Sequence, residues 1–192
     1  MTAATAVMAA RNASAQARIV AYLVDSVILL SFIFLFFVIA GLQLLVISDF
    51  AERDAPDSSM YAAPAIVLGG TMIAWSCFNL ALLRWRGQTA GQYVAGIRVK
   101  RQDGSSPSGR QLLLRWLLLD PLLFHPLLAV IWFVDVVVVV SLTVSEAALV
   151  AGLFFVFVCL MAPVVALAAV LADKERRALH DRLAGTVVVH AE

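Results

Sequence analysis

The chain has 192 residues, of which 62% are hydrophobic and only 14% are charged, with a formal net charge of +1. Soluble domains are about 45–50% apolar and about 25% charged, so this composition excludes an ordinary soluble domain and indicates an integral membrane protein. The length predicts a single domain. The two cysteines, Cys77 and Cys159, lie in apolar stretches without CxxC or Cys/His spacing. We therefore expect them to be packing residues rather than a disulfide or a metal site.

Four apolar segments follow one another, and each reaches the roughly 20 residues that a membrane-spanning helix needs. The expected spans lie at about residues 19–43, 61–83, 124–144 and 147–172. Pro121 and Pro126 remove helix donors from the long third segment, so residues 111–119 are interpreted as an interfacial lead-in. Lipid permits only helices and closed barrels, and the chain lacks a barrel's ten-residue alternation. The sequence therefore predicts an all-α membrane protein with a four-helix transmembrane bundle.

A small cytoplasmic β element is expected between spans two and three and at the C-terminus. The stretch GIRVKR, from Gly96 to Arg101, alternates like a strand and is followed by the turn-forming QDGSSPSG. The stretch GTVVVH, from Gly185 to His190, is a second candidate strand, and our hypothesis is that the two pair and hold the tail against the central loop. Residues 1–16 are expected to be disordered, and residues 17–190 to form one transmembrane domain.

The basic residues are distributed very unevenly. Two precede the first span, seven lie between spans two and three, and four follow the fourth span, which places 13 of the 14 on one side; only Arg53 falls on the other. The positive-inside rule then predicts a multi-pass protein of the inner (plasma) membrane with both termini in the cytoplasm.

Several charged residues lie where charge is expensive. Arg18 and Asp25 stand near the start of the first apolar run, seven residues apart, which puts them on one helix face about 10 Å apart, too far for a direct pair. Arg18 is expected either to reach lipid phosphate or to act inside the protein. Asp25 is expected to face the bundle interior, either as a structural hydrogen-bonded carboxylate or as part of an ion relay. Asp135 is a second intramembrane carboxylate, either a partner in that relay or a lone protonated acid.

Other motifs point away from enzyme chemistry. Gly87, Gly91 and Gly96 do not form a phosphate loop, because no GK[ST] follows, and close backbone packing is the better interpretation. The histidines show no metal spacing, and no catalytic dyad, triad or metalloprotease motif is present. We therefore expect no enzyme activity, no catalytic residue, no cofactor and no metal. The basic central segment is explained by anionic lipid headgroups, so no nucleic-acid partner is expected.

Four stretches in order carry a family resemblance: ARIVAYLVDSVIL at the first span, RGQTAGQYVAGIRV after the second, LLLRWLL before the third and ALHDRLAGTVVV near the end. From Ala17 to Val189 the chain resembles the RDD family of bacterial membrane proteins. The family is named for an Arg and two Asp, which map here to Arg18, Asp25 and Asp181. The cytoplasmic motif positions are Gly87, Thr89, Gly91, Gly96, Arg115 and His180. The chain departs from the family at Gln92, where a Lys or Arg usually follows the second Gly of the GxTxG motif.

The resemblance implies a transport role, and cation/proton exchange has been proposed for some members. We therefore expect a small transporter or transporter subunit that moves a cation or proton through Asp25 and Asp135, working as a homo-oligomer or with a membrane partner. The alternative is a non-transporting scaffold or assembly factor that docks a partner through its cytoplasmic loop and tail. In either case an Arg18–Asp181 pair is expected to position the tail, with Arg18, Asp25 and Asp181 forming one cluster.

Overall fold

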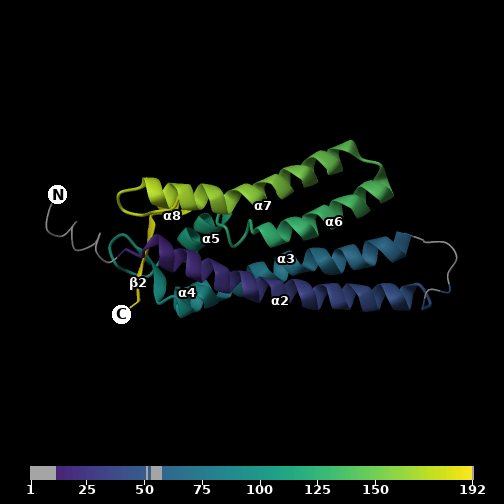
Figure 1. The fold of residues 1–192 in the computed structure, drawn as a ribbon, viewed down its shortest axis with the longest axis horizontal. Helices are drawn as coiled ribbons and strands as arrows, with labels where there is room; N and C mark the ends of the chain where they lie inside the picture. Colours follow the sequence, from purple (N-terminus) through teal and green to yellow (C-terminus); the bar gives the residue numbers. More distant parts are fainter. Residues whose placement is uncertain (1–11, 51, 53–57, 192) are drawn as a thin grey trace.

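The structure, a computed structural model, describes residues 12–50, 52 and 58–191. Helix α2 (Ala15–Ile47) forms an antiparallel hairpin with α3 (Ser58–Arg86), and α6 (Pro126–Thr143) forms a second with α7 (Glu146–Ala172). Contacts between α3 and α6 join the two hairpins into a four-helix bundle (Figure 1). All four helices are long and apolar enough to cross a membrane. The expected spans are confirmed as helices, with bounds that differ by only a few residues.

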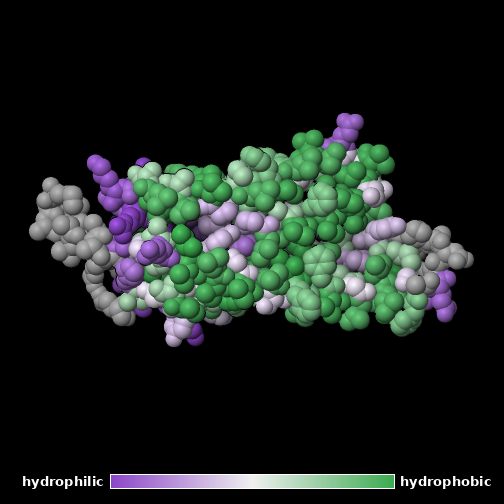
Figure 2. Space-filling model, viewed as in Figure 1, coloured by the Kyte–Doolittle hydropathy of each residue, from purple (hydrophilic) through white to green (hydrophobic). Residues whose placement is uncertain are grey.

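The face of the bundle seen in Figure 2 is apolar along most of its length. Large hydrophobic side chains point outward from all four helices, including Phe34, Ile66, Phe133 and Phe154. The interior packs a second set around the fully buried Trp75: Leu29, Leu128, Ile131 and Cys159. Helices that are hydrophobic all round suit a lipid surrounding rather than water. Both cysteines are free, and Cys159 is buried as expected for a packing residue, whereas Cys77 is exposed because it lies on the outward face of α3.

One end of the bundle carries a compact group of short elements, which we call the platform. It consists of α4 (Ala90–Val94), β1 (Ile97–Arg101), α5 (Gly109–Leu117), α8 (Leu179–Ala184) and β2 (Thr186–His190). Strand β1 pairs antiparallel with β2, with Ile97 opposite His190 and Arg101 opposite Thr186. The expected pairing of the two strands is thereby confirmed. The opposite end, with the connections between paired helices, is the loop end (Figure 1).

The start of the described chain also joins the platform. Asn12 forms an isolated bridge with Val189, and the Ala13 N–H donates to the Val188 carbonyl at 2.8 Å. Ser14 then caps α2 by accepting from the Ala17 N–H. Of the stretch expected to be disordered, residues 1–11 lie outside the described residues, whereas 12–16 pair with β2 and begin α2.

Capping residues explain where the short helices begin. Thr89 and Gln92 form a reciprocal capping box at α4, and Ser108 and Gln111 do the same at α5. Helix α5 buries Leu112 and Trp116 while exposing Leu113 and Leu117 on its other side. This one-sided burial agrees with the expected lead-in to the third span, because such a helix can lie along a membrane surface.

Candidate functional site

Asp181, in α8, is the centre of a buried ion-pair network. It is 0% exposed, and its two carboxylate oxygens accept from different arginines. Arg18 Nη1 of α2 lies 2.8 Å from Oδ2, and Arg115 Nε of α5 lies 2.9 Å from Oδ1. Arg18 also donates to the Arg176 carbonyl at 2.9 Å. The expected Arg18–Asp181 pair is present, and Asp181 thereby ties α2, α5 and α8 together.

Arg115 extends the network to two further groups. Its Nη1 lies 3.0 Å from Asp120 Oδ2, and its Nη2 lies 3.3 Å from His180 Nε2. A guanidinium only donates, so His180 Nε2 accepts, and a neutral His180 carries its proton on Nδ1. Arg115 is only 4% exposed. Such a buried cation is tolerated because paired carboxylates surround it.

Ionisation of the network follows from these contacts. Burial by itself would raise the pKa of Asp181, but the Arg115 guanidinium, His180 and Arg18 outweigh burial and hold this pKa well below its usual range. Burial, reinforced by the two arginines, holds the pKa of His180 below its ordinary value, although Asp181 and Asp120 oppose the shift. At neutral pH the network therefore contains two arginine cations, the Asp181 anion and a neutral His180.

Asp25 makes a separate set of contacts. The Thr89 hydroxyl donates to Oδ2 at 2.7 Å, and the Gly91 N–H donates to Oδ1 at 2.8 Å. Both donors belong to the start of α4, so Asp25 fastens this short helix against α2. The close approach requires Gly91, because a Cβ at that position would lie 2.0 Å from the Ala21 carbonyl oxygen. The expected single cluster of Arg18, Asp25 and Asp181 is therefore divided into two fastening points.

His125 forms a third polar contact, at the start of α6. The Leu127 N–H donates to its Nδ1 at 3.1 Å, so a neutral ring carries its proton on Nε2, 2.8 Å from the Ser26 hydroxyl. Ser26 in turn donates to the Tyr22 carbonyl, and the Tyr22 ring stacks on His125 with centroids 4.8 Å apart. Burial lowers the pKa of His125 to about 4. His125 is thus a neutral cap that joins α6 to α2.

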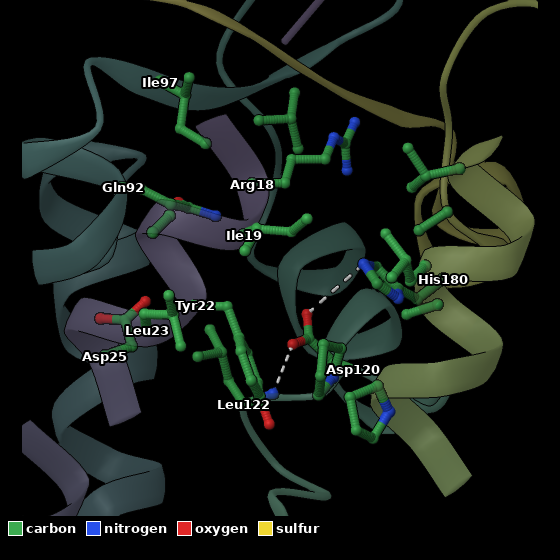
Figure 3. A pocket seen from close by; sticks show the side chains of 18 of the residues that line it. Arg18, Ile19, Tyr22, Leu23, Asp25, Gln92, Ile97, Asp120, Leu122 and His180 are labelled. Carbon is green, nitrogen blue, oxygen red and sulfur yellow. Dashed lines mark hydrogen bonds and ion pairs between the residues drawn. The ribbon is translucent and has the colours of Figure 1, made fainter. Parts of the chain in front are cut away.

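A cavity of about 370 Å³ lies between these groups. Figure 3 shows Asp25 and Gln92 on one side of it and Asp120 and His180 on the other. Its remaining walls are mostly apolar and come from α2, from the residues after α5, from α7 and from the platform: Ile19, Ala21, Leu23, Ile97, Pro121, Leu122, Pro163, Ala166, Leu167, Val170, Ala178 and Val188. The cavity is therefore amphipathic, with polar groups on two sides and a mostly apolar remainder, and its volume lies within the range of small-molecule sites.

Asp135 lies away from this cavity. It is half-buried in α6 beside Gly69 of α3, where an added Cβ would lie 3.2 Å from its Oδ2. Ser26, the neighbour of Asp25 on α2, contacts His125 at the start of α6, so Asp25 and His125 lie at a similar level of the bundle. Asp135 follows His125 by ten residues along α6, which places it about 15 Å further toward the loop end. The structure does not bring the two carboxylates of the expected relay together.

Between these levels, the described part of the bundle contains buried polar atoms without a hydrogen-bond partner. Four belong to α3 and α6: Asn79 Oδ1, Thr71 Oγ1, Trp132 Nε1 and Asp135 Oδ1. Asn79 and Thr71 are both 0% exposed and lie eight residues apart, on one face of α3. An unsatisfied buried polar atom costs about 1–3 kcal/mol, so a row of them needs a physical explanation.

The motif positions identified in the sequence fall on the platform. Thr89 and Gly91 hold Asp25, and Arg115 and His180 join the Asp181 network. Gly87 and Gly96 adopt positive φ at turns, where glycine is the favoured residue. Gln92, at the position that departs from the family pattern, is 7% exposed and accepts from the Thr89 N–H.

Sequence reasoning interpreted Asp120 as a cap or lead-in residue but missed its ion pair with Arg115, and it missed the capping role of His125. Asp120 accepts from the Leu122 N–H, as a lead-in cap would, but it also pairs with Arg115. His125 stands directly before Pro126, the first residue of α6. Proline is common at the first position of a helix, so the sequence did contain a signal that His125 caps this helix. Among the described residues, no group of three or more His, Cys, Asp or Glu side chains could hold a metal ion.

Four apolar helices joined to a charged platform at one end define a polytopic membrane protein with buried ion pairs. The family model of the RDD family matches residues 12–185, nearly the whole chain. The chain belongs to the RDD family. Comparisons with curated proteins and with solved structures found no match.

Proposed function

We propose that the protein is a membrane transporter, or a transporter subunit, that exchanges a cation for a proton. The observation that carries this proposal is the row of unpartnered polar atoms at Asn79, Thr71 and Asp135 inside an apolar bundle. An ionisable residue inside a membrane span is costly and commonly marks an ion or proton path, and Asp135 is such a residue. Water molecules bridging these atoms would satisfy them and would connect the cavity with Asp135.

The two intramembrane carboxylates take different parts in this proposal. Asp25 is fully engaged by Thr89 and Gly91, so we assign it to the wall of the cavity that serves as the entrance. Asp135 keeps one oxygen without a partner, so we assign the titrating step to it. Trp75, fully buried between Asn79 and Thr71 on the same helix face, would restrict the path.

The orientation belongs to the same proposal. The platform end carries nearly all the basic residues, which supports a cytoplasmic platform and cytoplasmic termini in a plasma membrane. Cysteine labelling tests it after Cys77 and Cys159 are replaced by alanine. A cysteine at Glu146, at the loop end, should react in intact cells, and one at Ser105, on the platform, should not. The reverse pattern would overturn the orientation.

Proton flux in proteoliposomes tests the transport role. With a cation gradient imposed and an internal pH dye as reporter, the wild-type protein should move protons. Asp135→Asn should reduce the flux by roughly tenfold or more while leaving stability unchanged or increased, because it removes a carboxylate that has an unsatisfied oxygen. Glu146→Gln is the matched control, since it removes an exposed carboxylate at the loop end. Absence of wild-type flux, or full flux in Asp135→Asn, would refute the proposal.

A scaffold role is the second candidate, and one observation favours it. The network around Asp181 and the contacts of Asp25 are used to hold the platform rigidly against the bundle. Tyr93 and Val94 on α4 are each 64% exposed, so this fixed platform presents apolar side chains outward. Photo-crosslinking from position 93 in cells should then give one discrete adduct, and Gly91→Ala, which displaces α4, should abolish it. Crosslinking to lipid alone would exclude this role.

A further inference from the structure

The cavity lies where α2 and α7 face each other across the bundle. Its α2 wall includes Ile19 and Leu23, which are 42% and 57% exposed, and its α7 wall includes Leu167, which is 38% exposed. These residues belong both to the cavity and to the apolar outer surface. A ligand dissolved in the membrane could therefore enter sideways, between α2 and α7, without passing through water.

Two guanidinium groups, Arg18 and Arg115, and two carboxylates, Asp25 and Asp120, line the cavity. The buried Asp181 does not line it, but it pairs with both arginines and adds a third carboxylate beside the cavity. Asp181 already accepts from both arginines, at 2.8 and 2.9 Å, so an anionic ligand would have to compete with it. A positive ligand would instead meet two lining carboxylates whose guanidinium neighbours are already neutralised by Asp181, between mostly apolar walls where charge interactions are stronger than in water.

The walls also restrict which kind of cation fits. An inorganic cation needs several oxygen ligands close around one point, whereas the two lining carboxylates, Asp25 and Asp120, lie on opposite sides of this cavity (Figure 3). Tyr22 lines the cavity and presents an aromatic ring, which attracts organic cations. The volume of about 370 Å³ is sufficient for a compact organic molecule rather than a bare ion.

We propose that the cavity between α2 and α7 binds an amphipathic organic cation, a molecule with an ammonium- or phosphonium-type charge on an apolar body. The charged part lies near Asp25, Asp120 and Tyr22 (Figure 3). The apolar part lies against Leu23, Pro163 and Leu167, which belong to the lining. The inference rests on the proposed function only in naming the exchanged cation. Binding itself requires no gradient and no proton movement.

Two ions of nearly equal size and opposite charge test the charge preference. The protein in phosphatidylcholine nanodiscs is titrated with tetraphenylphosphonium or tetraphenylborate, and ion-selective electrodes report the free ion. Protein-free nanodiscs give the partition background for each ion. The wild-type protein should bind tetraphenylphosphonium saturably, at one ion per chain, and at least roughly tenfold more tightly than tetraphenylborate.

Variants then locate the site. Ala166 lines the cavity, so Ala166→Leu should remove the saturable binding, whereas Ala168→Leu, at an exposed position on the same helix, should not. Asp25→Asn keeps a side chain of the same shape and should weaken tetraphenylphosphonium binding roughly tenfold. Unchanged size-exclusion profiles and unfolding midpoints serve as the folding control for the two alanine-to-leucine variants. Asp25→Asn gives up one of its two hydrogen bonds, so an unchanged size-exclusion profile alone serves as its control.

The outcomes separate binding from transport. Equal or tighter tetraphenylborate binding by the wild-type protein would overturn the inference without reference to any variant. Saturable tetraphenylphosphonium binding that survives in a folded Ala166→Leu protein would place the ion elsewhere and would also overturn it. Binding with no proton flux would support the cavity assignment and refute the transport proposal, and flux without such binding would do the opposite.

Discussion

The contact between α4 and α2 gives the sharpest prediction, a substitution of one glycine. Gly91→Ala would place a Cβ 2.0 Å from the Ala21 carbonyl oxygen and 2.7 Å from Asp25 Cγ, whereas ordinary contact begins at 3.4 Å. The first of these atoms is backbone and cannot rotate away. Helix α4 would therefore have to move away from α2 by about 1.4 Å, the difference between 3.4 and 2.0 Å.

The magnitude follows from what this movement breaks. The two hydrogen bonds to Asp25 are 2.7 and 2.8 Å long, and the added separation would take both beyond hydrogen-bonding range. Hydrogen bonds to a charged group contribute about 1.5–3 kcal/mol each, so Gly91→Ala should cost about 3–6 kcal/mol of unfolding free energy. Asp25 is only 2% exposed, so water cannot easily replace the lost donors.

Equilibrium unfolding in mixed micelles, followed by tryptophan fluorescence, measures this cost. Gly41→Ala on α2 is the matched control, because an added Cβ there meets nothing within 4 Å. It should be neutral or stabilising by up to about 1 kcal/mol, since alanine favours a helix interior. Asp25→Ala added to Gly91→Ala should cost little more, because the shared contact is already lost. A Gly91→Ala protein as stable as wild type would refute the proposed fastening role of Asp25.

Three further predictions follow from the network, the helix packing and His125. Arg115→Met should cost about 3–5 kcal/mol of unfolding free energy, because it removes the arginine that pairs with both Asp120 and Asp181. Arg18→Met should cost clearly less, because Asp181 still pairs with Arg115 in that variant. Equal costs of the two substitutions in mixed micelles would contradict this order. Gly152→Ala should lower the unfolding free energy by about 1–3 kcal/mol, because the added Cβ would lie 1.7 Å from Val136 Cγ2 between α6 and α7. Ala168→Leu, at an exposed position of α7, is the control, and equal unfolding midpoints of the two variants would contradict this prediction. Burial lowers the folded-state pKa of His125 to about 4, below its ordinary value of 6.5, so between these pH values the unfolded chain binds a proton that the folded protein does not. The unfolding free energy should therefore fall by up to about 3 kcal/mol as pH decreases from 6.5 to 4. His125→Asn retains a capping oxygen but does not titrate, so its unfolding free energy should depend less on pH over this range, and an unchanged pH profile would contradict the assignment.

The sequence predicted most of the architecture because the relevant signals are local. Four apolar runs of sufficient length require four helices in lipid, and the alternation in GIRVKR and GTVVVH indicates strands. The Arg18–Asp181 pair was also predictable, because both residues are expensive to bury alone and lie at the same end of their spans.

The site was predicted less completely because its contacts depend on which helices become neighbours. Periodicity places Asp25 on an inward face, but it does not reveal that Thr89 and Gly91 fold back to meet it from more than 60 residues away. For the same reason Asp25 and Asp135 looked like one relay, whereas packing places them at different depths. Arg115 and Asp120 stand on either side of a bend after α5, and only that bend turns them toward each other.

The pairing of β2 with β1 has a consequence for how the protein is made. Strand β2 and Asp181 follow all four spans in the chain. Arg18 and Arg115 are therefore synthesised before their partner Asp181, which leaves the ribosome 163 residues after Arg18. Chains elongate at about 5–20 residues per second, which leaves the first span in the membrane for roughly 10 seconds or more before this pairing is possible. During that interval Arg18 can interact with lipid phosphate, and β1 has an unpaired edge exposed to other proteins. The newly made protein therefore passes through an open intermediate, in which chaperones or proteases can act before the last strand closes the platform.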